Sequence, residues 1–534
     1  MDLEFPPGTV RIEDLSQSDG AGEAILQPRP TSNPNDPLNW SLWRKNLNFS
    51  LTSYYVLMIF ALIDVATVTW APVHRELGFS FALLNNSYAA GCGALAVGAI
   101  ILVPFSLKLG RRPIYVISTA AQCGLSVWLA KMVNVADLMG PNVLTCLVGA
   151  LAEVLVQMTV ADIYFVHQRG LANTIYYWVM TAGVTLSPLA GGYVTASQGW
   201  RWVWWWMVIL LGAGFVAFVF LYEETMFSRS IDGLAVPDAN DATHSPDKKD
   251  SELPAAQENA TAEKGPSDIA AVAIDHSIPK KSYCQRLALW TISPISWGQA
   301  AKHAYQPFLI IFWFPSIFFM AFEYGLLTAC STVPVTTLSA VMPLPPYNFG
   351  PEQIGLMGIP PFIGVSLATI LSGPVSDRLA VFLARRNHGV FEPEMRLWQA
   401  LAFAALVPAG LFMFGIGLNN GSHWLLPAFG LGISAFGIVP ASSSALTYLT
   451  DSYTDIIADA VVGVTFIRNV ISTFFVFVQT PWIDRVGLDW FYVTFGLIVA
   501  VIMLGNLPLI YFGKRLRIQL AARYRRYAQN FDGV

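Results

Sequence analysis

Four ionisable side chains fall within long apolar stretches of this chain: Asp64, Glu153, Glu323 and Arg468. A charge in the middle of a lipid bilayer costs at least about 2.5 to 3.5 kcal/mol, so residues of this kind are candidates for function. A carboxylate can bind a cationic group or a proton, and an arginine can bind a carboxylate or an anionic group. These residues therefore suggest the binding of a charged molecule or a proton.

Glu153 lies near mid-depth if its apolar stretch is a helix that rises about 1.5 Å per residue. Gln157 follows four residues later on the same helical face, whereas Asp162 points the other way. We expect this face to offer a carboxylate and an amide to a central cavity, where Glu153 binds a cationic group or a proton. The alternative is an internal hydrogen bond from Glu153 to a neighbouring helix.

Arg468 also lies near mid-depth, with Asn469 beside it and Gln479 continuing its face. An arginine at this depth needs a partner. That partner is either a carboxylate such as Glu153 or an anionic group of a bound molecule. Arg468, Asn469 and Gln479 are therefore candidates for substrate or proton binding.

Asp64 and Glu323 are expected in the outer portions of their apolar stretches. A carboxylate shielded from water takes up a proton more readily than one in water, so Asp64 is a candidate proton site. Glu323 is a second candidate for substrate or proton binding. The alternative for each is a residue at the outer rim, in contact with water.

The elements that must position these residues are membrane helices. Hydrophobic residues make up 54% of the chain and charged residues only 12%, against roughly 25% charged in soluble proteins. A bilayer core needs about 20 largely apolar helical residues. Twelve such stretches are expected, at about 47–70, 81–106, 113–133, 142–165, 172–197, 202–222, 304–328, 351–375, 397–418, 424–449, 459–482 and 488–513.

The predicted fold class is an all-α membrane protein with twelve transmembrane helices in two six-helix bundles. A polar segment rich in Asp, Ala, Ser, Pro and Lys separates the bundles, and such a composition has little to bury. The expected organisation is a cytoplasmic N-terminal tail (1–46), a first bundle (47–222), a largely disordered cytoplasmic linker (223–303), a second bundle (304–513) and a basic cytoplasmic tail (514–534). Within the linker, Tyr283 to Trp290 is expected to form a short surface helix.

Lysine and arginine in the short loops predict the orientation, because cytoplasmic loops retain positive charge. One set of loops holds Arg44, Lys45, Lys108, Arg111, Arg112, Arg169, Arg378, Arg385, Arg386, Arg396 and the tail from Lys514 to Arg526. The opposite set holds Arg75, Lys131, Arg201 and Arg485. Both termini are thus expected in the cytoplasm. We place the multi-pass protein in the plasma membrane, with the basic tail on anionic lipid.

Several partners are not expected. The formal charge of −4 does not favour nucleic acid, and the five cysteines share no metal or redox spacing, so no metal, cofactor or disulfide is predicted. Membrane lipid is the expected surrounding, and the protein is expected to be a monomer. Asn85 and Asn420 carry N-glycosylation patterns and are predicted to lie outside, close to the membrane, which would make the chain a glycoprotein.

The chain resembles the major facilitator superfamily, and within it the fungal drug:proton antiporter group, near its branch of yeast histidinol and polyamine transport. The resemblance covers about residues 33 to 517. It rests on the segments DPLNWSLWRK (36–45), KLGRRP (108–113), ADIYFVHQRG (161–170), SPLAGGY (187–193), GWRWVWWW (199–206), PPYNFGPEQIGLMGIPPFIG (345–364), GPVSDR (373–378) and PEMRL (393–397).

The resemblance implies transport by alternating access, in which the first and seventh spans face a central cavity. It also implies gating at the cytoplasmic surface by Arg111, Arg112 and Asp162. Leu107 stands where the family has an aspartate, so this latch is expected to be weaker. The second half keeps its copy of the gating pattern in Asp377 and Arg378.

The fifth span is similar to the packing motif of the antiporter group, which accompanies export. Its residues are Gly183, Ser187, Pro188, Gly191 and Gly192. Small residues at this spacing form a close packing face, and a proline permits a bend. The fourth span has Thr145 where the family carries a coupling arginine, so that residue's role cannot be transferred.

The leading hypothesis for function is proton-coupled export of a small organic compound, such as a drug or a secondary metabolite. The alternative is proton-coupled import of an organic cation such as a polyamine. A membrane-embedded enzyme is a remote alternative, because His167 and His303 lack the acidic neighbours that catalysis would need. A receptor with the same fold that binds without transporting is another.

Overall fold

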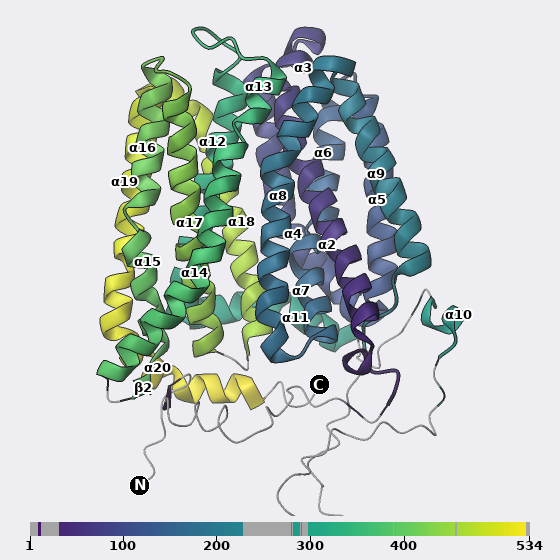
Figure 1. Ribbon diagram of the computed structural model, residues 1–534, viewed down its shortest axis with the longest axis vertical. Coiled ribbons are helices and arrows are strands. Elements are labelled where there is room, and N and C mark those ends of the chain that lie inside the picture. Colours follow the sequence, from purple (N-terminus) through teal and green to yellow (C-terminus); the bar gives the residue numbers. More distant parts are fainter. Residues whose placement is uncertain are drawn as a thin grey trace, which may run out of the picture.

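Long helices run side by side through almost the whole molecule in the computed structural model (Figure 1). The structure describes residues 9–11, 31, 33–227, 279, 281–288, 290, 297–387, 389–453 and 456–529. Most of the predicted linker, including the part expected to be disordered, lies outside the described residues.

The first bundle begins after a short 3-10 helix, η1 (Pro37–Asn39). Its helices are α2 (Leu42–Asp64), η2 (Val65–Thr69), α3 (Trp70–Leu77), α4 (Phe81–Leu109), α5 (Arg111–Ala130), α6 (Val135–Gly149), α7 (Leu151–Ile163), α8 (Val166–Gln198) and α9 (Trp200–Leu221). The first span therefore continues through η2 and α3, and the fourth is divided at Ala150.

The second bundle follows the one-turn helix α10 (Tyr283–Arg286). Its helices are α11 (Trp297–Trp313), α12 (Pro315–Val341), α13 (Pro351–Leu356), α14 (Ile359–Arg386), η3 (Pro393–Arg396), α15 (Leu397–Phe403), α16 (Leu406–Asn419), α17 (Leu425–Ser452), α18 (Ile457–Val486), α19 (Leu488–Leu504) and α20 (Asn506–Gln529).

Eleven helices in the described part of the chain are long and apolar enough to cross a membrane. The helix α8 has 33 residues and stands among them at the same height (Figure 1). Its polar and small residues make it less apolar than the others, because it packs on α2 and α13 rather than facing lipid alone. With α8 included, six spans lie on each side of the linker, as predicted.

The seventh span extends further outward than the predicted end near residue 328. The predicted position of Glu323 in the outer portion of this span is therefore wrong. The helix α12 begins at Pro315, where proline fits the first turn, and continues to Val341. Glu323 is therefore about 27 Å from the outer end of α12, at 1.5 Å per residue, and not in the outer portion of its span.

The elements outside the spans lie at one end of the bundles, called the inner end here, where β1, α10 and α20 are found (Figure 1). The strand β1 (Val10–Arg11) pairs antiparallel with β2 (Val390–Phe391), which joins the N-terminal tail to the second bundle. Nearby, Arg517 of α20 donates two hydrogen bonds to Glu394, at 2.9 and 2.6 Å, and both side chains are buried. The N-terminal tail is thus anchored on the second bundle.

The two bundles meet closely near their outer ends, where α8 packs on α13. A Cβ atom added at Gly192 would lie 2.4 Å from the Pro351 carbonyl oxygen, and one at Gly355 would lie 2.4 Å from the Pro188 carbonyl oxygen. At Gly358 the added atom would lie 2.1 Å from the Thr185 carbonyl oxygen. The helices therefore touch backbone to backbone, which larger residues would prevent.

Candidate functional site

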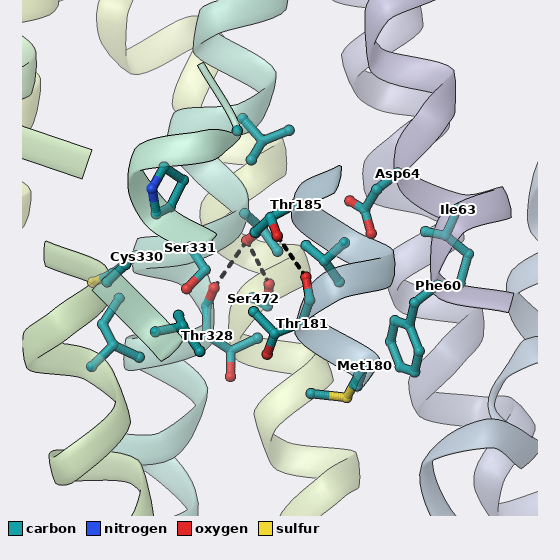
Figure 2. A pocket seen from close by; sticks show the side chains of 18 of the residues that line it. Phe60, Ile63, Asp64, Met180, Thr181, Thr185, Thr328, Cys330, Ser331 and Ser472 are labelled. Atoms are coloured by element: carbon teal, nitrogen blue, oxygen red, sulfur yellow. Dashed lines mark hydrogen bonds between the residues drawn. The ribbon is translucent and has the colours of Figure 1, made fainter. Parts of the chain in front are cut away.

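A cavity of about 210 Å³ lies between the two bundles. Helices of both halves line it, and Figure 2 shows Asp64 and Phe60 on one side facing Thr328, Ser331 and Ser472 on the other. The side formed by α2 and α4 is largely apolar apart from Asp64, whereas α12, α17 and α18 contribute many hydroxyl groups. An enclosed site with an apolar side and a few polar groups is typical of small-molecule binding.

Asp64 ends α2 at the point where the helix tightens into η2, and its side chain lines the cavity. The residue is 4% exposed, and the Tyr88 hydroxyl donates a hydrogen bond of 2.8 Å to Oδ1. Arg468 is the one lysine or arginine among the described cavity-lining residues, and it pairs with Glu153 instead. Asp64 therefore presents a carboxyl group to the cavity without a cationic partner there.

Glu153 and Arg468 form an ion pair across the two halves of the molecule. The Asn469 amide donates a second hydrogen bond, of 2.9 Å, to the other carboxylate oxygen of Glu153. The Arg468 guanidinium also lies over the Tyr324 ring, 5.3 Å from its centroid. The sequence predicted either a carboxylate or a bound anionic group as the partner of Arg468, and in the structure the partner is the Glu153 carboxylate.

This ion pair lies at the inner end of the cavity. Glu153 is about 15 Å from the inner end of α7, and Arg468 about 16 Å from the inner end of α18, at 1.5 Å per residue. The α8 and α13 contact lies toward the opposite, outer end of the cavity, and Thr185, Pro188 and Gly358 belong to both. The cavity therefore extends from the ion pair toward the outer contact.

Three further binding candidates do not line the cavity. Glu323 is buried and accepts a hydrogen bond of 2.8 Å from the Asn506 amide. Gln479 connects α18 to α12 through Thr336 and Thr337, at 2.9 and 3.1 Å. Gln157, one turn beyond Glu153, is also outside the set of lining residues. Their positions correct the expectation that Gln157 and Glu323 face the cavity, and they place the binding candidate Gln479 between α18 and α12.

The gating residues of the first half have different partners. The Arg111 guanidinium bonds Asp162 at 3.3 Å, as the sequence suggested. Arg112 does not pair with Asp162; it donates to the carbonyl oxygens of Tyr222, Val219 and Leu287. Arg112 thus holds the end of α9 and the described end of the linker.

Glu224 was missed by the sequence analysis. Its carboxylate accepts hydrogen bonds from the backbone N–H groups of Arg111 and Arg112, both at 3.0 Å, where α5 begins. A carboxylate is favourable at a helix N-terminus, where N–H groups lack partners. Leu107 has no carboxylate, so the acidic group at the start of α5 comes from Glu224, in the segment after α9. The acidic pair Glu223–Glu224 at the end of the sixth span was the available signal.

In the second half the partner of Asp377 is Arg396, at 3.4 Å, rather than Arg378. Arg396 also donates to Asp451 at 2.5 Å, whereas Arg378 is exposed. Asp451 ends the tenth span much as Asp162 ends the fourth. The sequence signal was therefore the PEMRL segment, which held the arginine that the gating prediction overlooked.

The packing motif of α8 faces two different elements. A Cβ atom at Gly183 would lie 2.8 Å from the Leu57 carbonyl oxygen, and one at Gly191 would lie 2.3 Å from a methyl carbon of Val65. Gly192 and Pro188 face α13 instead, and Pro188 lines the cavity. Ser187 has a buried hydroxyl oxygen and does not line the cavity. The motif therefore joins α8 to the first span on one face and to the second bundle on the other.

One of the two glycosylation candidates is buried. Asn85 is 3% exposed, within α4, and its amide donates to the Val476 carbonyl oxygen at 2.8 Å. A glycan could not attach there without separating α4 from α18, so this prediction is wrong. Asn420 is exposed at the end of α16, and glycosylation there remains a prediction.

Comparison with known proteins gives a family match over residues 56–474, to the model described as Major Facilitator Superfamily. An uncharacterized MFS-type transporter of Schizosaccharomyces pombe is 32% identical, over 98% of this chain and 94% of the relative. Protein HOL1 of Saccharomyces cerevisiae is 29% identical, over 96% of this chain and 93% of that protein. Efflux pump radE of Floropilus chiversii is 24% identical, over 93% of this chain and 88% of that protein.

Solved structures show the same fold. The proton:xylose symporter XylE matches with a TM-score of 0.56 at 12% identity, covering 88% of this chain and 97% of that chain. The peptide transporter POT matches with a TM-score of 0.57 at 14% identity, covering 88% and 95%.

Proposed function

Because the chain belongs to the major facilitator superfamily, we propose that it is a proton-coupled secondary transporter that exports a small organic compound by alternating access. Its family consists of transporters, so the chain is a multi-pass membrane transporter and not an enzyme. The proposal adds the driving ion, the direction and the kind of substrate.

The observation that carries the proposal is the central cavity with Asp64 on one side and the Glu153–Arg468 pair at its inner end. Asp64 can exchange a proton with the cavity, because no cationic side chain among the described lining residues is free to pair with it. A proton and a cationic compound would then compete for one carboxylate. Such competition couples the movement of the two in opposite directions.

The Glu153–Arg468 pair connects the two bundles inside the molecule during the transport cycle. Its two residues belong to α7 and α18, so the pair must lengthen or break when the bundles rock apart at the inner end. At the outer end the α8–α13 contact must separate in the opposite step. A substrate or proton that favours one arrangement of the bundles would bias this equilibrium.

Export is the proposed direction. It is supported by the packing motif of α8, which resembles that of antiporters, and by a relative whose name is an efflux pump. We further propose that the transporter lies in the plasma membrane as a monomer, with both termini in the cytoplasm.

Import of an organic cation is the second candidate. Among the described lining residues, the acidic and basic ones are Asp64, Glu153 and Arg468, and the last two neutralise each other. The remaining carboxylate gives the cavity a negative balance whenever Asp64 is ionised, which favours a cationic molecule in either direction of transport.

Vesicles containing the purified protein and an internal pH indicator would test coupling and direction. Under an imposed proton gradient, a compound panel that includes phenyltrimethylammonium is expected to produce compound-dependent proton flux. Asp64→Asn is expected to lower this flux at least about tenfold, since it removes the proton-exchanging group. Asp484→Asn, the same change at an exposed position near the outer end of α18, is the control and should leave the flux unchanged.

The movement of labelled compound relative to the proton would decide between export and import. Unchanged flux in the Asp64→Asn protein would place the proton site elsewhere. No proton movement with any compound of the panel would rule out coupling.

A further inference from the structure

Most hydroxyl groups that line the cavity have already donated their hydrogen within the protein. A hydroxyl group has one hydrogen to donate and two lone pairs that accept. In the first bundle, Thr67 donates to the Asp64 carbonyl oxygen and Tyr88 to the Asp64 carboxylate, both at 2.8 Å. Thr181 and Thr185 donate to the carbonyl oxygens four residues earlier in α8, at 2.9 and 2.7 Å. Toward a molecule in the cavity, these oxygens can therefore act only as acceptors.

The second bundle shows the same pattern on α12. Thr328 donates to the Tyr324 carbonyl oxygen at 2.9 Å, and Thr332 donates to the Thr328 carbonyl oxygen at 3.3 Å. The Ser472 hydroxyl of α18 bonds that of Thr332 at 3.0 Å. Ser331 differs, because it is exposed and its hydroxyl has no partner among the described residues. On this wall, too, acceptors outnumber donors.

These acceptors gather around the Asp64 carboxylate. The part of α8 at 183–191 packs along residues 57–65 of the first span. Thr185 and Asp64 both belong to this contact region, so they lie at similar depth. In the view of Figure 2, Thr185 lies between Asp64 on one side and Thr328 on the other. A group bound in this part of the cavity therefore meets a carboxylate and hydroxyl oxygens that accept.

The other hydroxyl groups do not change this balance around Asp64. Tyr324 accepts a hydrogen bond of 3.5 Å from Arg468 and keeps its own hydrogen to donate, but it lies at the inner end of the cavity. Tyr177 lines the cavity about 16 Å from the inner end of α8, close to the depth of Arg468 in α18. The hydroxyl oxygens of Ser434 and Ser442 are fully buried and do not reach a molecule in the cavity.

We propose that the cavity selects a cation that carries N–H groups, a primary or secondary ammonium, over a quaternary ammonium of similar shape. The N–H groups donate to the Asp64 carboxylate and to the hydroxyl oxygens around it, among them those of the half-buried Thr185 and Thr328. A quaternary ammonium has no hydrogen to donate and leaves these acceptors without partners. This inference rests on the proposed function, because it names the substrate class of the same cavity.

A methylation series would test the selection. Benzylammonium and its N-methyl, N,N-dimethyl and N,N,N-trimethyl forms all carry one positive charge near neutral pH, and each methyl group replaces one N–H. Binding would be measured as thermal stabilisation of the purified full-length protein at increasing probe concentration. Benzylammonium is expected to bind about 3 to 10 times more tightly than the trimethyl form, as one additional hydrogen bond allows. A site that recognises only charge and apolar surface would favour the trimethyl form instead.

The variants separate the hydroxyl oxygens from the charge. The double variant Thr185→Val, Thr328→Val keeps the shape of both side chains and should lower the preference at least about threefold, with unchanged affinity for the trimethyl form. The corresponding double variant to serine should keep the preference. Thr174→Val is the matched control, because Thr174 makes the same kind of bond in α8, to the Gly170 carbonyl oxygen, at an exposed position outside the cavity. Asp64→Asn should weaken all four probes, since they share one charge.

Three results would overturn the selection: equal or tighter binding of the trimethyl form, a preference that is unchanged in the double valine variant, or no binding of any probe. The vesicle experiment fails separately. Preferential binding without proton flux would refute coupling and leave the selection standing, whereas flux without preference would refute the selection alone.

Discussion

At the scale of single residues, the Glu153–Arg468 pair is the feature with the largest energetic consequence. Both side chains are buried, and Asn469 completes the bonding of the carboxylate. Removing one member of a buried pair leaves an uncompensated charge, which typically costs about 3 to 5 kcal/mol. The two members differ, however, because a glutamate can take up a proton and an arginine cannot lose one.

We therefore expect Glu153→Gln to destabilise the protein more than Arg468→Gln. The first leaves a buried guanidinium charged, whereas the second leaves a carboxyl group that can become neutral. The double variant should recover much of the stability lost in Glu153→Gln, since no unpaired charge remains. Thermal unfolding of the purified protein in detergent would measure all three. A double variant whose loss equals the sum of the single losses would contradict an energetic coupling between these residues.

At the scale of elements, the contact between α8 and α13 holds the outer ends of the bundles together. It depends on glycines, because Gly358 leaves no room for a Cβ atom beside the Thr185 carbonyl oxygen. Helices that approach this closely gain packing contacts that a single methyl group removes. The contact is therefore a sensitive point in the balance between the states of the transporter.

Gly358→Ala is expected to shift the protein away from the arrangement in which the outer contact is closed. A loss of about 1.4 kcal/mol in that arrangement changes its population ratio roughly tenfold. In a Ser339→Cys background, which places a thiol on the cavity wall, labelling by a membrane-impermeant maleimide from outside should become several times faster.

Gly212→Ala is the matched control, because an added Cβ atom meets nothing within 4 Å there. It should leave the labelling rate of the Ser339→Cys protein unchanged. Equal labelling in the Gly358→Ala and Gly212→Ala proteins would mean that the glycine contact does not control access from outside.

At the scale of the whole molecule, one end carries the elements outside the spans. The strand pair β1–β2, the helix α10 and the basic helix α20 all lie at the inner end (Figure 1). Positive residues predict that this end faces the cytoplasm. If so, the loop between α16 and α17 faces outward.

Cysteine labelling in cells would check this orientation. His423→Cys places a thiol in the exposed loop between α16 and α17, and Gln519→Cys places one on an exposed position of α20. A membrane-impermeant maleimide should label the first in intact cells and the second only after permeabilisation. The unsubstituted chain gives the background of native cysteines. The reverse pattern would invert the predicted topology.

Much of the fold followed from the sequence because a bilayer imposes a strict requirement. Each span must be apolar and must satisfy its own backbone hydrogen bonds, so helices can be recognised one at a time. The predicted fold class and family are confirmed. The end of the seventh span was misplaced because the outer part of α12 carries many Thr and Ser residues, which weaken the apolar signal.

The sequence also brought out Asp64, Glu153 and Arg468, because charge in an apolar stretch is visible without any knowledge of neighbours. It could not decide which of these residues face one cavity. Glu323 has the same local appearance as Asp64, yet the rotation of α12 places it against Asn506, while its neighbour Tyr324 lines the cavity.

Only the tertiary structure decided the partners. Glu153 and Arg468 are 315 positions apart in the chain, and their contact depends on how α7 and α18 are rotated and placed. The same holds for Arg396 with Asp451, and for Asn85 buried against α18.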